Sequence, residues 1–411
     1  MNILSGLGKL AGALVAALVM TSLAHAQQEI LIGYHGPMTG PASWVGLGGR
    51  DGALLALDEI NAAGGVHGRK IRMISYDDGA KPSEAEAVAK KLIESDKVFA
   101  ILGGGVSYVA IVVGEEAHRG KVPYMNGSGA SPKIIDAQSR WVFSGATIDI
   151  RDISNNEATF IGEYLKAKKV AVMSATDEFS QTLTDEVIKS LKERYGVEVL
   201  TRQKYNPGDT DFSSQLLAVK QANPDHVMLF GLYVEAARAL RQARELGIRT
   251  PFIGDTSMMN SGLLTVAGAA AEGLTVEYVP LYFNGNKARD MVEFEARYKK
   301  KFPSYPVDRP NYVDVYNYGT MYALAEGMKR AGPNMTQKGL VEALETLKDF
   351  KASDSWPNAV HVIQLLSFNE SHNGNRRLSF HRVVGGTFVP ITDFKVPAPT
   401  TKFPANASLK W

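Results

Sequence analysis

The chain has 411 residues, 45% of them hydrophobic, and its 45 Lys and Arg nearly balance its 43 Asp and Glu, which leaves a net charge of +2. The absence of cysteine excludes disulfide scaffolds, Cys-based zinc sites and thiol nucleophiles. The small net charge provides no electrostatic footprint for a polyanion, so we expect no nucleic-acid partner. A chain of this length is expected to form two lobes, each with its own core.

The first 26 residues have the pattern of a secretory signal peptide. Lys9 precedes an apolar run from Leu10 to Leu23, and Ala-His-Ala ends at Ala26. This run is shorter than the ~20 residues that span a bilayer, so the pattern favours cleavage after about Ala26 over a membrane anchor. We therefore expect an exported, periplasmic protein whose mature chain begins near Gln27.

From Ile30 onward, short apolar runs alternate with amphipathic stretches, which is typical of βαβ units and a parallel sheet. The predicted strands are 30–34, 70–76, 99–102, 122–125, 169–173, 226–230 and 251–254. The predicted helices include one around 53–60, one from about Ser83, and those at 180–195, 212–222 and 234–246. Ser83 and Glu86 have the spacing of a capping box, which predicts the start of the second helix.

The alternation of strands and helices predicts an α/β fold class. Two parallel sheets of this kind do not merge easily into one compact unit, so we expect two α/β lobes. We assign 27–147 to a first lobe and 148–274 to a second. A helical stretch then returns 275–357 to the first lobe, and a β-rich stretch returns 358–396 to the second. The end of the chain, 397–411, is rich in Pro, Thr and Ala and is expected to be poorly ordered.

Ligands of open α/β sheets bind beyond the carboxyl ends of the strands, near helix N-termini. The strand at 99–102 is followed by the glycines of 103–105, Ser107 and Tyr108. This turn is suited to holding a carboxylate or another anionic oxygen. An equally simple interpretation is a plain turn with Ser107 as the helix cap.

A second polar turn follows the strand at 122–125. It contains Gly127, Ser128 and Ala130, whose small side chains allow a ligand to approach the backbone. The same sequence also fits an ordinary loop, so by itself it is a weak signal.

Four aromatic residues lie in predicted loops or helix starts, where a core role is less automatic than on a helix face: Trp44, Tyr108, Phe179 and Tyr233. Each could stack on a ligand. For any single one, covering the edge of the core is the better interpretation.

Enzyme and cofactor motifs are incomplete. Ser107 would be the serine of a G-x-S-x-G elbow, but Val109 replaces the second glycine. The glycines of 46–49 lack dinucleotide-binding spacing, and Asp77 and Asp78 have no His or Glu at metal-ligand spacing. We therefore expect no metal, no cofactor and no catalysis, with an exported α/β hydrolase and a freestanding ligand sensor as alternatives.

Several segments together resemble the branched-chain amino-acid-binding family of periplasmic solute-binding proteins: IGYHGPMTG (32–40), ALDEINAAGGVHGRK (56–70), YDD (76–78), DTDFS (209–213), LRQA (240–243) and AAAEG (269–273). The resemblance covers nearly all of the mature chain in order. It implies two Rossmann-like lobes with parallel sheets joined by a three-crossing hinge, the type I periplasmic-binding fold. It also implies a monomer that clamps a small-molecule solute and delivers it to the membrane permease of an ABC transporter.

The resemblance also implies roles for individual residues. Ser107 corresponds to the family serine that receives the ligand carboxylate. Ser128 and Ala130 match the turn that completes this clasp, although the family often has a threonine hydroxyl where Ala130 has none. Phe179 and the Leu232–Tyr233 pair match positions that are usually tyrosine. Val45, beside Trp44, matches an aromatic lid position of the family.

The sharpest departure from the family is Thr256, which replaces the carboxylate that pairs with the α-ammonium of an amino acid. An unpaired buried ammonium is unfavourable by several kcal/mol. The resemblance therefore implies an aromatic or aliphatic acid, or an amide, as the solute. If Asp255 turns in to replace the missing acid, a branched-chain or other α-amino acid is the alternative.

Overall fold

The computed structural model describes residues 29–136, 139–145, 148–278, 287–304, 310–362, 366–368, 370–372, 378–398, 401–402 and 405–411. The signal peptide expected at 1–26 lies outside these ranges. None of the helices in the described ranges is both long and apolar enough to cross a membrane.

The first lobe is built on a five-stranded parallel sheet with the order β2-β1-β3-β4-β5. Its strands are β1 (Ile30–Gly36), β2 (Ile71–Asp77), β3 (Ala100–Gly103), β4 (Tyr124–Asn126) and β5 (Val142–Ser144), and its first helices are α2 (Ser43–Ala62), α3 (Pro82–Lys90), α4 (Ser107–Gly120) and α5 (Lys133–Asp136). The central strands β3 and β4 are buried along their whole length, as expected for parallel strands covered by helices on both faces.

The second lobe contains a seven-stranded sheet with the order β12-β11-β10-β9-β8-β6-β7. Its parallel strands are β6 (Lys169–Ala175), β7 (Glu198–Tyr205), β8 (His226–Phe230), β9 (Phe252–Gly254) and β10 (Thr275–Tyr278), and β11 (Ser379–Val384) and β12 (Thr387–Pro390) are antiparallel. Its helices are α6 (Ile150–Thr159), α7 (Glu178–Ser190), α8 (Ser213–Ala222), α9 (Tyr233–Glu245) and α10 (Ser261–Ala267). Short π-helical and 3₁₀ turns complete the chain: η1 (Lys91–Ser95), η2 (Phe160–Tyr164), η3 (Leu191–Tyr195), η4 (Thr256–Met258), η5 (Gly268–Ala271) and η6 (Asn406–Ser408).

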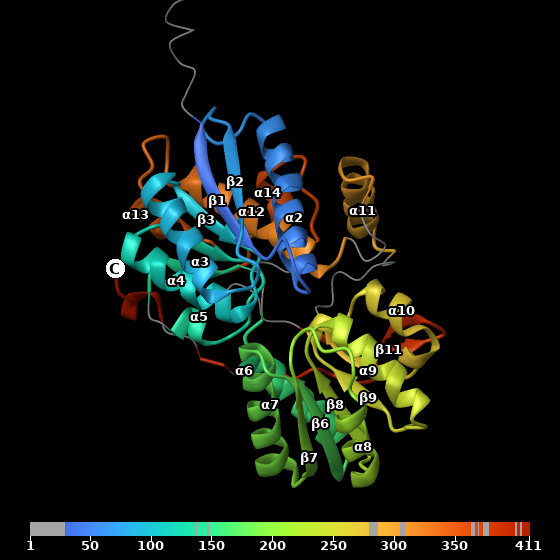
Figure 1. The fold of residues 1–411 in the computed structure, drawn as a ribbon. Coiled ribbons are helices and arrows are strands. Elements are labelled where there is room, and N and C mark those ends of the chain that lie inside the picture. The colour runs from blue at the N-terminus through green and yellow to red at the C-terminus, as the bar shows by residue number, and fades with distance from the viewer. Residues whose placement is uncertain are drawn as a thin grey trace, which may run out of the picture.

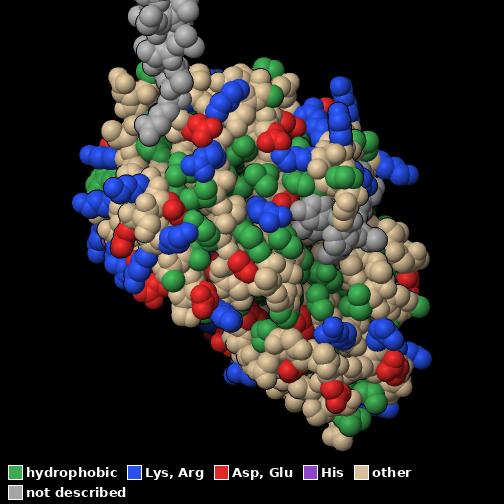
Figure 2. Space-filling view, turned by 45° about the horizontal axis from the view of Figure 1, so that its top comes forward, with side chains coloured by type: hydrophobic (Ala, Val, Ile, Leu, Met, Phe, Trp, Pro, Cys, Tyr) green, Lys and Arg blue, Asp and Glu red, His purple; other side chains and the backbone are tan. Residues whose placement is uncertain are grey.

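The chain returns to the first lobe with α11 (Arg289–Lys301), α12 (Tyr312–Arg330), α13 (Gln337–Leu344) and α14 (Ala352–Ser355). Helix α12 is buried over most of its length and packs against α2. The two backbones approach so closely that a Cβ on Gly52 would lie 1.9 Å from the carbonyl oxygen of Asp314. Only glycine fits there, and the close crossing places the N-terminal end of α12 beside the junction of the lobes. Figure 1 shows the two lobes one above the other, and Figure 2 shows hydrophobic side chains along their junction.

Two domain boundaries differ from the sequence prediction. Residues 275–278, assigned to the first lobe, form β10 in the middle of the second sheet. Residues 366–372, assigned to the second lobe, pack on the first, where Phe368 stacks edge-on against Phe143 and His372 Nδ1 lies 2.8 Å from the carbonyl oxygen of Val142. The rings of Phe368 and His372 both pack against Phe143 on the edge strand β5, which the local sequence does not reveal.

The C-terminal end, expected to be poorly ordered, is tied to the first lobe. The backbone N–H of Arg140 donates to the carbonyl oxygen of Lys410 at 2.9 Å. The ring of Trp411 lies 5.6 Å from that of Trp141, centroid to centroid. The chain therefore passes between the lobes a fourth time, as the red segment in Figure 1 shows.

The second helix also starts differently from the sequence prediction. Helix α3 begins at Pro82, with Lys81 as its cap residue and no side-chain cap. The predicted capping box of Ser83 and Glu86 is therefore not formed. Proline at the first helical position has its φ angle already set for a helix, and this fixes the start one residue earlier.

Candidate functional site

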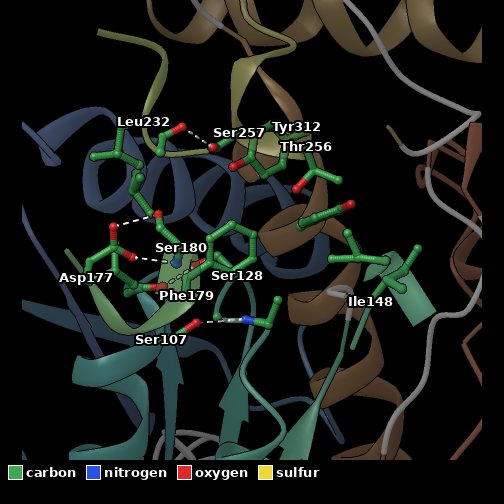
Figure 3. Close-up of a pocket in the computed structure, with 18 of the residues that line it drawn as sticks. Ser107, Ser128, Ile148, Asp177, Phe179, Ser180, Leu232, Thr256, Ser257 and Tyr312 are labelled. Carbon is green, nitrogen blue, oxygen red and sulfur yellow. Dashed lines mark hydrogen bonds between the residues drawn. The ribbon is translucent and has the colours of Figure 1, made fainter. Parts of the chain in front are cut away.

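A cavity lies between the lobes, beyond the carboxyl ends of β3, β4, β6, β8 and β9, and we call it the inner cavity. It contains about 690 Å³ of space, part of it open to solvent. It is lined by Val45, Gly105, Val106, Ser107, Ser128, Gly129, Ala130, Ile148, Ile153, Asp177, Phe179, Ser180, Gly231, Leu232, Thr256, Ser257, Tyr312, Tyr316 and Leu378. This is the location predicted from the sheet topology, and Figure 3 shows its main side chains.

Ser107 connects the two predicted turns. It is the first residue of α4 and is 2% exposed, and its Oγ accepts hydrogen bonds from the N–H groups of Ala130 and Ser131, each at 3.2 Å. Figure 3 shows one of these two bonds as a dashed line at Ser107. A serine hydroxyl has two acceptor lone pairs and one donor hydrogen. Both lone pairs are occupied, and in the described part of the chain the O–H has no acceptor. The hydrogen is therefore available to an acceptor atom in the cavity.

The second turn is braced from within the first lobe. Asn126 Oδ1 accepts the N–H of Gly129 at 2.9 Å, and the hydroxyl of Ser128 donates to the carbonyl oxygen of Gly105 at 2.8 Å. Ser128 and Ala130 line the cavity as expected, but Gly127 does not. A Cβ on Gly127 would lie 2.2 Å from Asn317 Oδ1, so this glycine permits packing against α12.

The aromatic positions divide into two groups. Phe179 lines the inner cavity, as does Val45, whereas Trp44 and Tyr233 are absent from its lining. The rings of Trp44 and Tyr233 meet edge to face across the lobe junction with centroids 5.2 Å apart. Tyr312, which the sequence analysis missed, lines the cavity, and its ring centroid lies 5.9 Å from that of Trp44. Trp44 and Tyr233 thus join the lobes beside the cavity.

Asp255 faces the interior of the second lobe. Its carboxylate is fully buried and accepts the N–H groups of Gly231 at 2.8 Å and Ser257 at 2.7 Å, together with the Ser257 hydroxyl. Burial raises the pKa of Asp255 to about 6, although the hydrogen bonds from Ser257 and Gly231 act in the opposite direction. Asp255 is absent from the cavity lining, and Thr256 is present. The alternative in which Asp255 turns into the cavity to replace the missing acid is therefore not seen.

An acid that the sequence analysis missed, Asp177, does line the cavity. It caps α7, where its carboxylate accepts the N–H of Ser180 at 3.1 Å and the hydroxyl of the same residue at 2.7 Å. The Asp-x-x-Ser spacing before a helix was the available signal, and it reads as an ordinary cap. Tyr108, predicted as a site residue, lines a neighbouring cavity instead.

Further contacts join the lobes in this structure. The hydroxyl of Ser131 donates to Glu178 Oε1 at 2.7 Å, and Lys133 Nζ lies 3.4 Å from the same oxygen. Ser131 and Lys133 belong to the first lobe and Glu178 to the second. These contacts and the ring pair of Trp44 and Tyr233 hold the two lobes against each other around the cavity.

The arrangement supports binding better than catalysis. Within the described ranges, no histidine or carboxylate is hydrogen-bonded to Ser107, and no cluster of three or more His, Asp or Glu could hold a metal ion. The cavity combines a donor-rich end at the start of α4 with apolar and aromatic walls. This combination suits a small solute with one anionic end.

Comparison with known proteins agrees with this geometry. Residues 29–387 match the periplasmic binding protein family. The chain is 29% identical over 326 residues to a leucine-, isoleucine-, valine-, threonine- and alanine-binding protein of Pseudomonas aeruginosa, covering 79% of this chain and 84% of the relative.

Solved structures share the fold at lower identity. A leucine-binding protein of Thermotoga maritima superposes with a TM-score of 0.76 at 24% identity, covering 88% of this chain and 98% of the other. A solute-binding protein of an ABC transporter from R. palustris, in complex with benzoate, gives a TM-score of 0.75 at 19% identity, covering 89% and 96%. These likenesses confirm the type I periplasmic-binding fold predicted from the sequence.

Proteins of this family bind small-molecule solutes for ABC transporters and work with membrane permeases in the periplasm. The family pattern spans most of the chain, and the motifs quoted from the sequence follow the same order. The chain therefore belongs to the periplasmic binding protein family, whose members are solute-binding proteins of transporters rather than enzymes.

Proposed function

We propose that the protein binds a small carboxylate without an α-amino group, an aromatic or aliphatic acid, and delivers it to an ABC permease after export and removal of the signal peptide. The amide of such an acid belongs to the same solute class, because its carbonyl oxygen is also an acceptor. The lobes close on the solute by a hinge motion. We expect the protein to act as a monomer.

The observation that carries this proposal is the hydroxyl of Ser107. Its two lone pairs are occupied by the N–H groups of Ala130 and Ser131, so towards the cavity it can act only as a donor. The first N–H groups of α4 have no partners within the helix and add positive potential at the same end. A carboxylate oxygen is the ligand group that this end stabilises best.

The absence of an α-amino group is inferred from Thr256 and Asp255. The carboxylate of Asp255 is held inside the second lobe by hydrogen bonds from Gly231 and Ser257 and does not line the cavity. Thr256 offers a hydroxyl but no charge. The carboxylate of Asp177 also lines the cavity, but it caps α7 in the second lobe, where it accepts the N–H and the hydroxyl of Ser180. At Thr256 an α-ammonium would lose its hydration and meet only an uncharged hydroxyl, which is unfavourable by several kcal/mol.

A thermal-shift screen of the exported protein tests the proposal. The panel contains benzoate, 4-ethylbenzoate, pentanoate, benzamide, leucine and isoleucine. A solute at 100 times its Kd adds about 2.7 kcal/mol to the stability of the folded state. We expect shifts with the acids and none with the α-amino acids, and a shift with leucine but not with benzoate or pentanoate would refute the proposal.

A further inference from the structure

A second cavity lies beside the inner cavity, and we call it the outer cavity. It contains about 720 Å³ of space, part of it open to solvent, and shares Val106, Asp177 and Leu232 with the inner cavity. Both lobes contribute to its walls. The first supplies Tyr108 and the second supplies Glu235. A solute held in the inner cavity could therefore extend into the outer one.

Glu235, on α9, is the unusual group in this wall. Its side chain is 1% exposed, and its Oε1 accepts the N–H of Gly208 at 2.8 Å. Its Oε2 is buried and has no hydrogen-bond partner in the described ranges. A buried carboxylate oxygen without a donor is unfavourable, because it loses its hydration and gains nothing in return.

The charge around Glu235 is negative. Asp177 lines the same cavity, and none of the described residues in the cavity lining is a lysine, arginine or histidine. The pKa of Tyr108 is raised to about 12, first by burial and then by the charges of Asp177 and Asp78. The pKa of Tyr205 is also raised, first by burial and then by acids that include Glu235 and Asp177. A cationic group would therefore be attracted to this cavity.

We propose that the outer cavity binds a positively charged, hydrogen-bond-donating group of the solute, an ammonium or guanidinium, which is received by Glu235 and Asp177. This inference rests on the proposed function, because the carboxylate of the same solute is held at Ser107. The two charges of the solute then lie at opposite ends of its body. The cation of the solute lies far from its carboxylate, so it does not need the acid that Thr256 replaces.

The position of the outer cavity also gives the cation a role in closure. Glu235 and Asp177 belong to the second lobe, whereas the carboxylate is held at the start of α4 in the first. A solute with both charges therefore contacts both lobes through charge-assisted hydrogen bonds. Such a solute favours the closed arrangement more than an acid with an apolar tail does.

Isothermal titration at pH 7.5 with matched probes tests this inference. The first pair is 4-(aminomethyl)benzoate and 4-ethylbenzoate, and the second is 5-aminopentanoate and pentanoate. In the exported protein, we expect the ammonium-bearing member of at least one pair to bind about tenfold or more tightly than its neutral partner. Glu235→Gln should reduce that ratio to near one.

Two further variants serve as controls. Glu245→Gln removes the same charge from an exposed position on the same helix and should leave the ratio unchanged. Asp177→Asn keeps an acceptor for the helix cap and should reduce the ratio in part. Circular dichroism and thermal unfolding confirm that each variant is folded.

The possible outcomes separate the two proposals. If a neutral acid binds and neither ammonium-bearing probe binds more tightly, or if the preference survives Glu235→Gln, the outer cavity is not a cation site, while the proposed carboxylate site stands. If no acid of the panel binds, the proposed function fails, and this inference fails with it.

Discussion

Replacing Ser107 by alanine tests the centre of the proposed site, and the structure predicts two separate effects. The first is on binding. The variant loses a hydroxyl donor to a charged acceptor, a hydrogen bond of about 1.5 to 3 kcal/mol, so Kd should rise about 10- to 150-fold. The second is on stability, because the N–H groups of Ala130 and Ser131 lose their acceptor in a buried environment. At 3.2 Å these bonds are long, and we expect a loss of about 1 to 3 kcal/mol in total.

The assay is isothermal titration with the strongest acid from the thermal-shift screen, combined with urea unfolding of the free protein. Ser128→Ala is the matched control, because its hydroxyl also lies at the cavity but donates to the carbonyl oxygen of Gly105. We expect that control to change Kd less than about threefold. A Ser107→Ala protein that loses stability but keeps its affinity would show that Ser107 only braces the two turns, which would refute the reasoning.

Three other substitutions give distinct expectations. Thr256→Glu should create leucine binding, detected by thermal shift, whereas Thr256→Gln should not, because only the acid supplies the charge that an α-ammonium needs. Glu157→Gln should raise the free energy of unfolding at pH 7 by about 1 kcal/mol or more, and by less at pH 4.5. Glu157 and Glu277 are fully buried, and burial, followed by repulsion from Glu277, raises the pKa of Glu157. Above the unfolded-state pKa of Glu157 the unfolded chain therefore ionises more easily than the folded one, which lowers the stability, and this loss disappears as the pH falls below that value. Equal gains at both pH values in urea titrations would contradict this. Trp44→Ala should weaken solute binding by favouring the open lobes, which small-angle scattering of the free protein would detect as a larger radius of gyration, and an unchanged radius would contradict it.

The strands and most helices could be predicted because their signals are local. Buried parallel strands such as β3 and β8 appear as short apolar runs, and helices such as α9 follow them with regular spacing. Domain boundaries depend on distant partners. Nothing in the sequence of β10 indicates whether it pairs with β9 or returns to the first sheet, and Trp411 reveals its role only beside Trp141.

The candidate site divides in the same way. Ser107 and Ser128 could be predicted because they follow strands directly, and the topology brings those strand ends together. Tyr312 could not, because it reaches the cavity from a helix about two hundred residues further along the chain. The sequence also assigns Gly127 and Asp255 to the ligand, because it does not show what they contact. Gly127 packs against Asn317, which is remote in the chain, and Asp255 binds the backbone N–H of Gly231, which no side chain announces.

The course of the C-terminal tail decides how lobe closure can be observed. Strand β1 and the residues around Trp411 both belong to the first lobe, so the two ends of the described chain move as one rigid body. Fluorophores attached at the two ends would keep a constant separation while the cleft opens and closes, and their energy transfer would report nothing. A sensor built on this protein needs one label on the second lobe, for example on the exposed part of α8 or α9, and the other label can remain at either end.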